Sequence, residues 1–356
     1  MPPRIASLIY TSKKFQPSIK GRSHFAAQIQ LEPSDHRTSY EVSIDCPQSM
    51  TDTSNHVSVV IPAHNGMDYL PTAVDSVLRQ THRNLEVIIV DNGSTDSTRA
   101  WAQSVSDPRV RYFYQENTGS PTGSRNTGIE QASGPIIAFL DCDDTWASSK
   151  LERQLKLLQP ANVGLVYCGA FDMDLHGNIL GRKDTGTPAR GWVLAELLRK
   201  NFICCSSVAL KKQILLDHNL RFQNGRPCAE DWDLWLRMAG VCEFDYVPEG
   251  LVHYRRHEGN TSGDIDLIHQ SGLTVLEEVI RRETGNASLD EQTRKRLLLA
   301  YRRSKSDTHL RYGHRLHACG RRSEAIRVML KVIRQRPAYA KGWWGLSKCV
   351  LKAPKR

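Results

Sequence analysis

The sequence carries a regular pattern of apolar positions that begins at residue 57. Residues 57–62 and 85–90 form nearly continuous apolar runs, which are typical of strands buried on both faces of a parallel sheet. Between these runs, apolar residues recur at the spacing of one helix face, at Leu70, Ala73, Val74, Val77 and Leu78. The pattern therefore predicts a strand, an amphipathic helix and a second strand.

The same succession repeats further along the chain. We predict a strand at 110–114, a glycine-rich helix at 120–132 and a strand at 135–140. Alternating strands and helices predict an α/β fold whose mostly parallel sheet is flanked by helices. In open parallel sheets ligands bind beyond the carboxyl ends of the strands, so the residues that follow each strand are the first candidates for a site.

The second half of the chain predicts a mixed arrangement followed by helices alone. We expect a hairpin at 174–178, a strand at 203–210, a helix from about Glu230, and helices throughout beyond residue 265. Four residues of this helical region have the spacing of one tetratricopeptide repeat, namely Gly313, Gly320, Ala325 and Pro337. Because one repeat cannot bury its apolar face alone, we expect a helical hairpin packed on the sheet domain or on a partner.

These elements predict three parts. Residues 1–55 are rich in Ser, Pro, Lys and Gln without periodicity, which predicts a mobile N-terminal extension. The sheet domain is expected at 56–265, with a first half at 56–160 and a second half at 161–265. Residues 266–356 are expected to form a basic helical extension.

Charge changes this picture only at the C-terminus. The net charge is +10, yet residues 281–356 alone hold 21 Lys or Arg and five Asp or Glu. Such a tail either contacts anionic lipid or an acidic partner, or is a solvated helix face. The nine cysteines form no CxxC pair, and no apolar run approaches the ~20 residues of a membrane span. We expect a cytoplasmic protein without a nucleic acid partner, and peripheral contact with the inner face of the membrane remains an open alternative.

Three carboxylates follow the strand predicted at 135–140, at Asp141, Asp143 and Asp144. Neighbouring carboxylates repel one another unless a cation or hydrogen-bond donors offset their charge. A divalent cation such as Mn²⁺ or Mg²⁺ takes one or two carboxylates and completes its shell with substrate phosphates. The motif therefore predicts a metal-assisted site for a nucleotide diphosphate, while turn and helix-cap positions remain the structural alternative.

Five segments of the chain occur in the order and spacing of one known family. They are VSVVIPAHN, YLPTAVDSVLRQ, EVIIVDNGSTDST, GSRNTGIEQASG and IIAFLDCDDTW, and the match extends over residues 56–262. Together they resemble the family 2 glycosyltransferases, which have the GT-A fold and take a sugar from a nucleotide-sugar donor.

The resemblance implies roles for the residues that follow the predicted strands. Asp91 is expected to accept a hydrogen bond from the base of the donor, Asp141 to face the ribose or the metal, and Asp143 to bind the metal. Arg125 is expected near the donor diphosphate, with exposure to solvent as the alternative. The nucleotide pocket is expected to be lined by Pro62, Ala63, His64 and Asn65. His64 and Asn92 stand where the family often has Tyr and Asp, so the identity of the base stays open.

On the acceptor side, residues 229–235 resemble an acidic motif of the family that opens a helix. Asp231 is the candidate general base that takes the proton of the acceptor hydroxyl, with Glu230 in reserve. A helix N-terminus favours the ionised form of either acid, and stabilisation of the helix alone is the alternative role. In the closing segment of the match, His257 is a candidate ligand of the metal or the diphosphate.

The sequence thus predicts an inverting, metal-assisted glycosyltransferase with a nucleotide-sugar donor, for which uridine diphosphate is the expected nucleotide. Inversion follows from the resemblance alone. The expected acceptor is a glycan, a lipid-linked or another glycoconjugate in the biosynthesis of a polysaccharide. Two alternatives remain: a nucleotidyltransferase of related fold, and a non-catalytic scaffold that binds a nucleotide-sugar.

Overall fold

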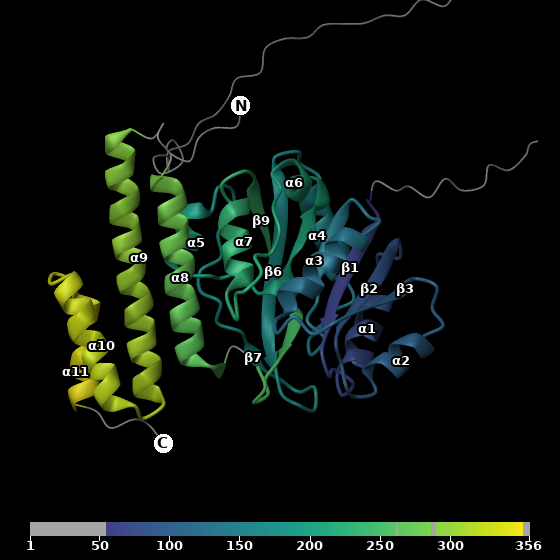
Figure 1. Ribbon diagram of the computed structural model, residues 1–356, viewed down its shortest axis with the longest axis horizontal. Coiled ribbons are helices and arrows are strands. Elements are labelled where there is room, and N and C mark those ends of the chain that lie inside the picture. Colours follow the sequence, from purple (N-terminus) through teal and green to yellow (C-terminus); the bar gives the residue numbers. More distant parts are fainter. Residues whose placement is uncertain (1–54, 261–262, 286–289, 352–356) are drawn as a thin grey trace, which may run out of the picture.

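The computed structural model describes residues 55–260, 263–285 and 290–351, which are arranged as one sheet with helices on both sides and a helical layer at one end (Figure 1). The strands are β1 (Val57–Ala63), β2 (Leu85–Asn92), β3 (Val110–Gln115), β4 (Ile136–Phe139), β5 (Thr145–Trp146), β6 (Val163–Met173), β7 (Ile179–Arg182), β8 (Ala209–Lys211) and β9 (Glu243–Arg255). The first seven helices are α1 (Leu70–Leu78), α2 (Thr98–Ser104), α3 (Pro121–Gln131), α4 (Lys150–Leu158), α5 (Leu194–Arg199), α6 (Lys212–Asp217) and α7 (Glu230–Met238). The remaining helices are α8 (Ile265–Thr284), α9 (Glu291–Ala318), α10 (Arg322–Gln335) and α11 (Ala340–Leu351).

The sheet confirms the predicted α/β class. Its order is β3-β2-β1-β4-β8-β6-β9-β5, with β7 paired beside β6. Strands β1 to β4 run parallel to one another, whereas β8 runs antiparallel to both β4 and β6. Every residue of β1 and β2 is buried, as expected of strands covered on both faces. The carboxyl ends of β1, β2 and β4 consequently lie at one edge of the sheet.

One predicted element is wrong in type. The strand expected at 203–210 is a turn of 3-10 helix, η3 (Cys205–Ser207), followed by the short strand β8. The turn closes its own hydrogen bonds, since Ser207 N–H donates to the Cys204 carbonyl at 2.9 Å. Its residues are buried, so an apolar run of this length does not distinguish a buried turn from a buried strand.

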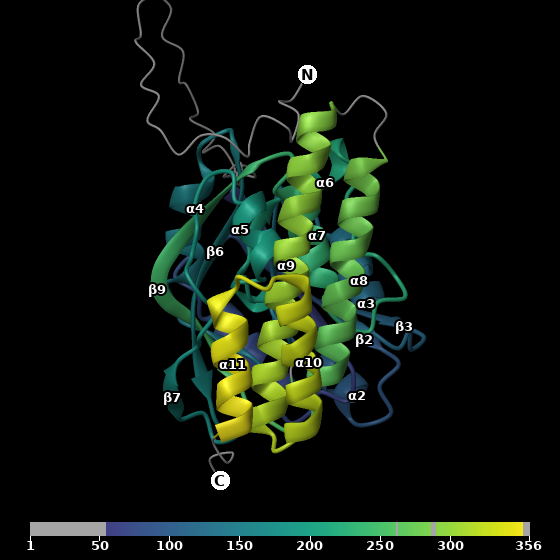
Figure 2. The ribbon, with the colours of Figure 1, turned by 90° about the vertical axis from the view of Figure 1, so that its left-hand side faces the viewer.

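The described residues beyond 265 form helices, as predicted. Helices α8 and α9 form a long antiparallel pair against α5 and α7, and α10 and α11 lie outside α9 (Figure 2). The outer pair has a small core of its own around Met329. A Cβ atom added at Gly313 or Gly345 would lie 2.8 or 2.7 Å from that side chain, so both glycines permit the close packing of three helices.

Two expectations concern the chain as a whole, namely its division into three parts and the lack of a membrane span. The predicted extension at 1–55 lies, apart from its last residue, outside the described residues, and the three-part division stays a prediction. Within the described ranges, no helix combines the length and the apolar composition needed to cross a bilayer.

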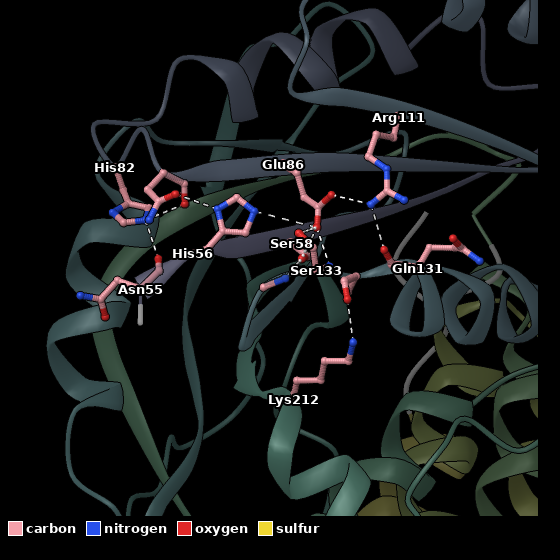
Figure 3. A network of polar contacts seen from close by, with 12 residues as sticks. Asn55, His56, Ser58, His82, Glu86, Arg111, Gln131, Ser133 and Lys212 are labelled. Carbon is pink, nitrogen blue, oxygen red and sulfur yellow. Dashed lines mark hydrogen bonds and ion pairs between the residues drawn. The ribbon is translucent and has the colours of Figure 1, made fainter. Parts of the chain in front are cut away.

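At the amino ends of the strands, Glu86 is the centre of a dense polar cluster (Figure 3). Its carboxylate accepts hydrogen bonds from Ser58 Oγ at 2.6 Å, from Ser133 N–H at 2.7 Å and Oγ at 2.6 Å, and from Arg111 Nη1 at 2.7 Å. We call Glu86 with these three partners the Glu86 network. Although burial acts to raise it, the pKa of Glu86 is lowered to about 2 by these donors. The network joins β1, β2 and β3 to the segment after α3.

Candidate active site

The acidic segment after β4 divides into a structural acid and two acids that face the site. Asp144 is fully buried and accepts hydrogen bonds from Ser206 Oγ at 2.6 Å and from Arg255 N–H at 3.0 Å. Burial, followed by the charges of Asp143 and Asp141, raises its pKa well above the ordinary value. Asp144 therefore fixes the turn between β4 and β5, which is the structural role that the sequence left open for this motif. The side chains of Asp141 and Asp143, by contrast, remain 28% and 21% exposed.

Asp143 lies against the loop that follows β9. His257 Nε2 lies 2.8 Å from Asp143 Oδ2, and Asn260 Nδ2 donates to the same oxygen at 3.2 Å. The imidazole stacks on Tyr69 with ring centroids 5.5 Å apart. Burial, and next the charge of Asp141, raises the pKa of Asp143, and the hydrogen bond with His257 opposes this shift. The carboxylate is thus short of compensating positive charge, which a cation would supply.

An open cavity of about 640 Å³ adjoins this pair. It is lined by Tyr69, Leu175, Arg256, His257, Glu258, Gly259, Asn260 and Gly263. Among the described residues, no group of three or more His, Cys, Asp or Glu side chains is arranged to hold a metal ion. The oxygen and imidazole donors of Asp143 and His257 nevertheless suit a hard divalent cation, which takes few protein ligands when substrate phosphates complete its shell.

Arg125 is buried, so the solvent-exposed alternative is wrong. Its guanidinium donates to Asp141 Oδ1 at 2.6 Å and to Glu230 Oε1 at 2.5 Å, and only 5% of the side chain is exposed. It also lies 5.4 Å from the ring of Phe222. Arg125 on α3 therefore joins the end of β4 in the first half of the sheet domain to the start of α7 in the second half. The two carboxylates accept from Nη1 and Nη2, whereas the buried Nε has no hydrogen-bond partner among the described residues. The expected approach of Arg125 to a diphosphate stays a prediction.

Asp231 is the second residue of α7. The helix begins directly after Ala229, which has a left-handed backbone (φ 64°, ψ 20°). Oδ2 accepts from Asn201 Nδ2 at 3.3 Å, and Oδ1 accepts from Trp232 N–H at 2.6 Å. Burial, and then the charge of Glu230, raises the pKa of Asp231 to about 7. The helix N-terminus favours the ionised form of this acid, but burial and the neighbouring carboxylate act in the opposite direction and outweigh it.

Asp91 is the last but one residue of β2 and is fully buried. Oδ1 accepts from Ser94 N–H at 2.8 Å, and Oδ2 accepts from the hydroxyl of Tyr112 at 2.8 Å. Burial and the bond to Asp91 raise the pKa of Tyr112 above its ordinary value. Both oxygens of Asp91 are thus oriented by the protein, and the predicted contact with the donor base would use their remaining lone pairs.

The loop after β1 lies beside the loop after β2. Pro62 and Ala63 are buried at the end of β1, whereas His64 and Asn65 are exposed. His64 Nδ1 lies 3.0 Å from the main-chain oxygen of Asn92, and Asn65 Oδ1 accepts from main-chain N–H groups of the loop after β2. Asn65 has a left-handed backbone, with φ 49°. These contacts hold together the two loops from which the nucleotide pocket is predicted to form.

Sequence reasoning missed the residues that orient the candidate groups. Tyr112, Asn260 and Tyr69 touch Asp91, Asp143 and His257 respectively. Only Asn260 carried a local signal, because it follows His257 by three residues in a loop where Asn is a common turn residue. The other contacts join segments that are distant in the sequence.

Comparison with known proteins identifies the family of the chain. The model of the glycosyl transferase family 2 matches residues 58–208. The Escherichia coli UDP-Glc:alpha-D-GlcNAc-diphosphoundecaprenol beta-1,3-glucosyltransferase WfgD is 32% identical over 210 residues, which are 58% of this chain and 80% of the relative. Other relatives are also named as glycosyltransferases.

Two solved structures share the fold. TarS 1-349 of S. aureus in complex with UDP-GlcNAc has a TM-score of 0.57 at 15% identity, over 83% of this chain and 90% of that one. The mannosyltransferase PcManGT of Pyrobaculum calidifontis in complex with GDP-Man and Mn²⁺ has a TM-score of 0.50 at 16% identity, over 83% and 87%. The strand order, the acids at the carboxyl ends of the strands and these likenesses lead to one conclusion: the chain belongs to the family 2 glycosyltransferases and is a glycosyltransferase with the GT-A fold.

Proposed function

We propose that this glycosyltransferase moves a sugar from a UDP-sugar to a glycan, a lipid-linked or another glycoconjugate acceptor, with inversion and with the help of a divalent metal. The observation that carries the proposal is the pair Asp143 and His257 beside the 640 Å³ cavity. Two similar proteins, one named for transfer from UDP-Glc and one solved in complex with UDP-GlcNAc, support a uridine nucleotide.

The donor half of the site would bind the nucleotide and hold the diphosphate. The loops after β1 and β2 line the nucleotide pocket, and Asp91 accepts a hydrogen bond from the base. Asp143 and His257 would hold the cation, with Asp141 behind them in its ion pair with Arg125. When bound, a divalent cation neutralises the negative charge that develops on the leaving diphosphate.

The acceptor half would supply the base. Asp231 takes the proton of the acceptor hydroxyl while the hydroxyl oxygen attacks the anomeric carbon, and the bond from that carbon to the diphosphate oxygen breaks on the opposite side. A pKa of about 7 suits this role, because such a carboxylate is substantially ionised at neutral pH and is a stronger base than an ordinary Asp. Attack opposite to the leaving group inverts the anomeric configuration.

The proposal is tested by turnover. The purified protein is incubated with a panel of UDP-sugars and of glycan or lipid-linked acceptors, with Mn²⁺ or with EDTA, and release of UDP is measured. We expect one pair to give acceptor-dependent release that EDTA abolishes, and a product with inverted anomeric configuration by nuclear magnetic resonance. Metal-independent turnover or retention of configuration would overturn those parts of the proposal, and turnover only with another nucleotide would overturn the choice of uridine.

A further inference from the structure

Helices α10 and α11 form the outermost layer at the helical end of the protein (Figure 2). Both helices expose large apolar side chains. On α11, Trp343, Trp344 and Leu351 are 53%, 56% and 80% exposed. Val350 beside them and Leu330 on α10 are also exposed. Adjacent large apolar side chains of this kind on a surface mark a contact with another apolar surface more often than isolated ones do.

The exposed side chains of α11 share one face of a helix that is firmly held by its other face. Residues 343, 347, 350 and 351 follow one another at helical spacing. The opposite face carries Gly342, Gly345 and Cys349, which are buried against α9 and α10. The exposed face therefore belongs to a packed, regular helix.

The surface around these side chains is strongly basic. Residues 321–351 hold eight Lys or Arg and a single acid, Glu324. The side chains of Arg327, Lys331, Arg334 and Lys341 are exposed on the two helices. Lys348 Nζ lies 3.4 Å from the ring centroid of Trp344, so a cation and an exposed aromatic ring are direct neighbours on α11.

We infer that this hairpin surface, made by Leu330, Trp343, Trp344, Val350 and Leu351 with the surrounding lysines and arginines, binds an anionic lipid bilayer. Tryptophan rings suit the boundary between headgroups and acyl chains, and lysine or arginine beside them is attracted to anionic headgroups. A second copy of the chain is a poor occupant, because two such basic surfaces repel each other. Nucleic acid offers phosphates to the cations but no apolar layer for the exposed aliphatic side chains.

The start of α10 is bonded to the start of α8, which follows the loop of the candidate active site. Arg321, directly before α10, donates to Asp266 Oδ2 at 2.6 Å, and the hydroxyl of Tyr312 also donates to Asp266. Asp266 opens α8, six residues after Asn260 of the candidate site.

The inference is tested by flotation of the full chain with vesicles, without donor or acceptor, so its outcome is independent of the proposed function. Vesicles of phosphatidylcholine with about one-third phosphatidylglycerol are compared with pure phosphatidylcholine at low and high salt. We expect binding to the anionic vesicles that weakens with salt. The double variant Trp343→Ser, Trp344→Ser is expected to lower the partition coefficient at least about tenfold, because it removes the two rings that the bilayer would bury.

Two further variants keep the test sharp. Lys341→Glu with Lys348→Glu retains both tryptophans and should weaken binding by at least about tenfold, since each cation near an anionic surface contributes about fivefold. Leu298→Ser with Leu299→Ser removes two adjacent exposed apolar side chains of α9, outside the hairpin surface, and should leave binding unchanged. Any one of three results would overturn the inference: no binding to anionic vesicles, equal binding by the tryptophan variant and the parent, or salt-resistant capture of a protein partner instead.

Discussion

The two edges of the sheet treat buried acids in opposite ways. At the amino ends of the strands, the Glu86 network gives one carboxylate four hydrogen bonds, and the pKa of Glu86 falls to about 2. At the carboxyl ends, Asp231 has one side-chain donor and one main-chain donor, and its pKa rises to about 7. Burial acts in the same direction at both places, so the hydrogen-bond donors around Glu86 and the negative charge of Glu230 beside Asp231 account for the difference.

This difference separates a stabilising acid from a reactive one. A carboxylate saturated by internal donors holds β1, β2 and β3 together but cannot take a proton near neutral pH. A carboxylate that is short of donors costs stability and gains basicity, which is what a general base requires. The same fold contains both kinds of acid, and the variants Asp231→Asn and Glu86→Gln distinguish them.

The largest effect is expected at Asp231. Asp231→Asn removes the proposed base but keeps the size of the side chain, so transfer should slow by ~10²–10⁴-fold while donor affinity stays that of the parent. Steady-state rates and donor titrations measure the two quantities separately. Glu86→Gln serves as the control and should leave the transfer rate of the folded protein unchanged. A parent-like rate for Asp231→Asn would contradict the assignment of the base.

The second effect concerns stability and its dependence on pH. The pKa of Glu86 lies below its ordinary value of 4.5, so the ionised carboxylate stabilises the fold at neutral pH and loses this contribution as the pH falls from about 4.5 toward 2. Glu86→Gln should therefore lower the free energy of unfolding by about 3 kcal/mol at pH 7 and by less at pH 3. Urea denaturation measures both values. An equal loss at the two pH values would show that the charge of Glu86 is not what stabilises this edge.

A third, smaller effect is expected in the pH profile of transfer. Because Asp231 must be ionised to accept a proton, kcat should fall about tenfold per pH unit below about 7. Glu230→Gln removes the neighbouring negative charge that raises the pKa of Asp231, so the acid limb should move to lower pH. Rates between pH 5 and 9 for the parent and the variant test this shift, and a limb that stays in place would assign it to another group.

The smallest effect is expected at Tyr112. Tyr112→Phe removes the hydrogen bond to Asp91 Oδ2, so the carboxylate loses part of its orientation and donor affinity should fall by a few-fold, which corresponds to about 1 kcal/mol. Tyr114→Phe on the same strand is the matched control, since its side chain is 45% exposed. Isothermal titration with UDP measures both variants. Equal affinities for the two would remove Tyr112 from the description of the donor site.

Much of the fold was predictable because its signals are local. The buried runs of β1 and β2 and the apolar stripe of α1 follow from the burial of whole strands and one helix face. The prediction of a strand at 203–210 was wrong because burial of an apolar run does not specify its backbone conformation.

The candidate site was less predictable because its contacts are long-range. The acids that follow the strands were identified by position alone, but Arg125 and Glu230 are 105 residues apart in the sequence, and their ion pair exists only in the folded chain. The pKa of Asp231 depends first on burial, which only the tertiary structure supplies, and next on the charge of Glu230, its neighbour in the sequence.

The most direct test of the account is metal-dependent donor binding at Asp143. Thermal unfolding of the parent and of Asp143→Asn is followed with UDP-sugars in the presence of Mn²⁺ or EDTA, with Asp75→Asn, an exposed acid of α1, as the control. The account predicts that Mn²⁺ and one donor together raise the midpoint for the parent and for Asp75→Asn, because a ligand that binds only the native state stabilises it. It predicts no rise for Asp143→Asn or in EDTA. An equal rise for Asp143→Asn, or one that persists in EDTA, would contradict the assignment of the metal and donor site.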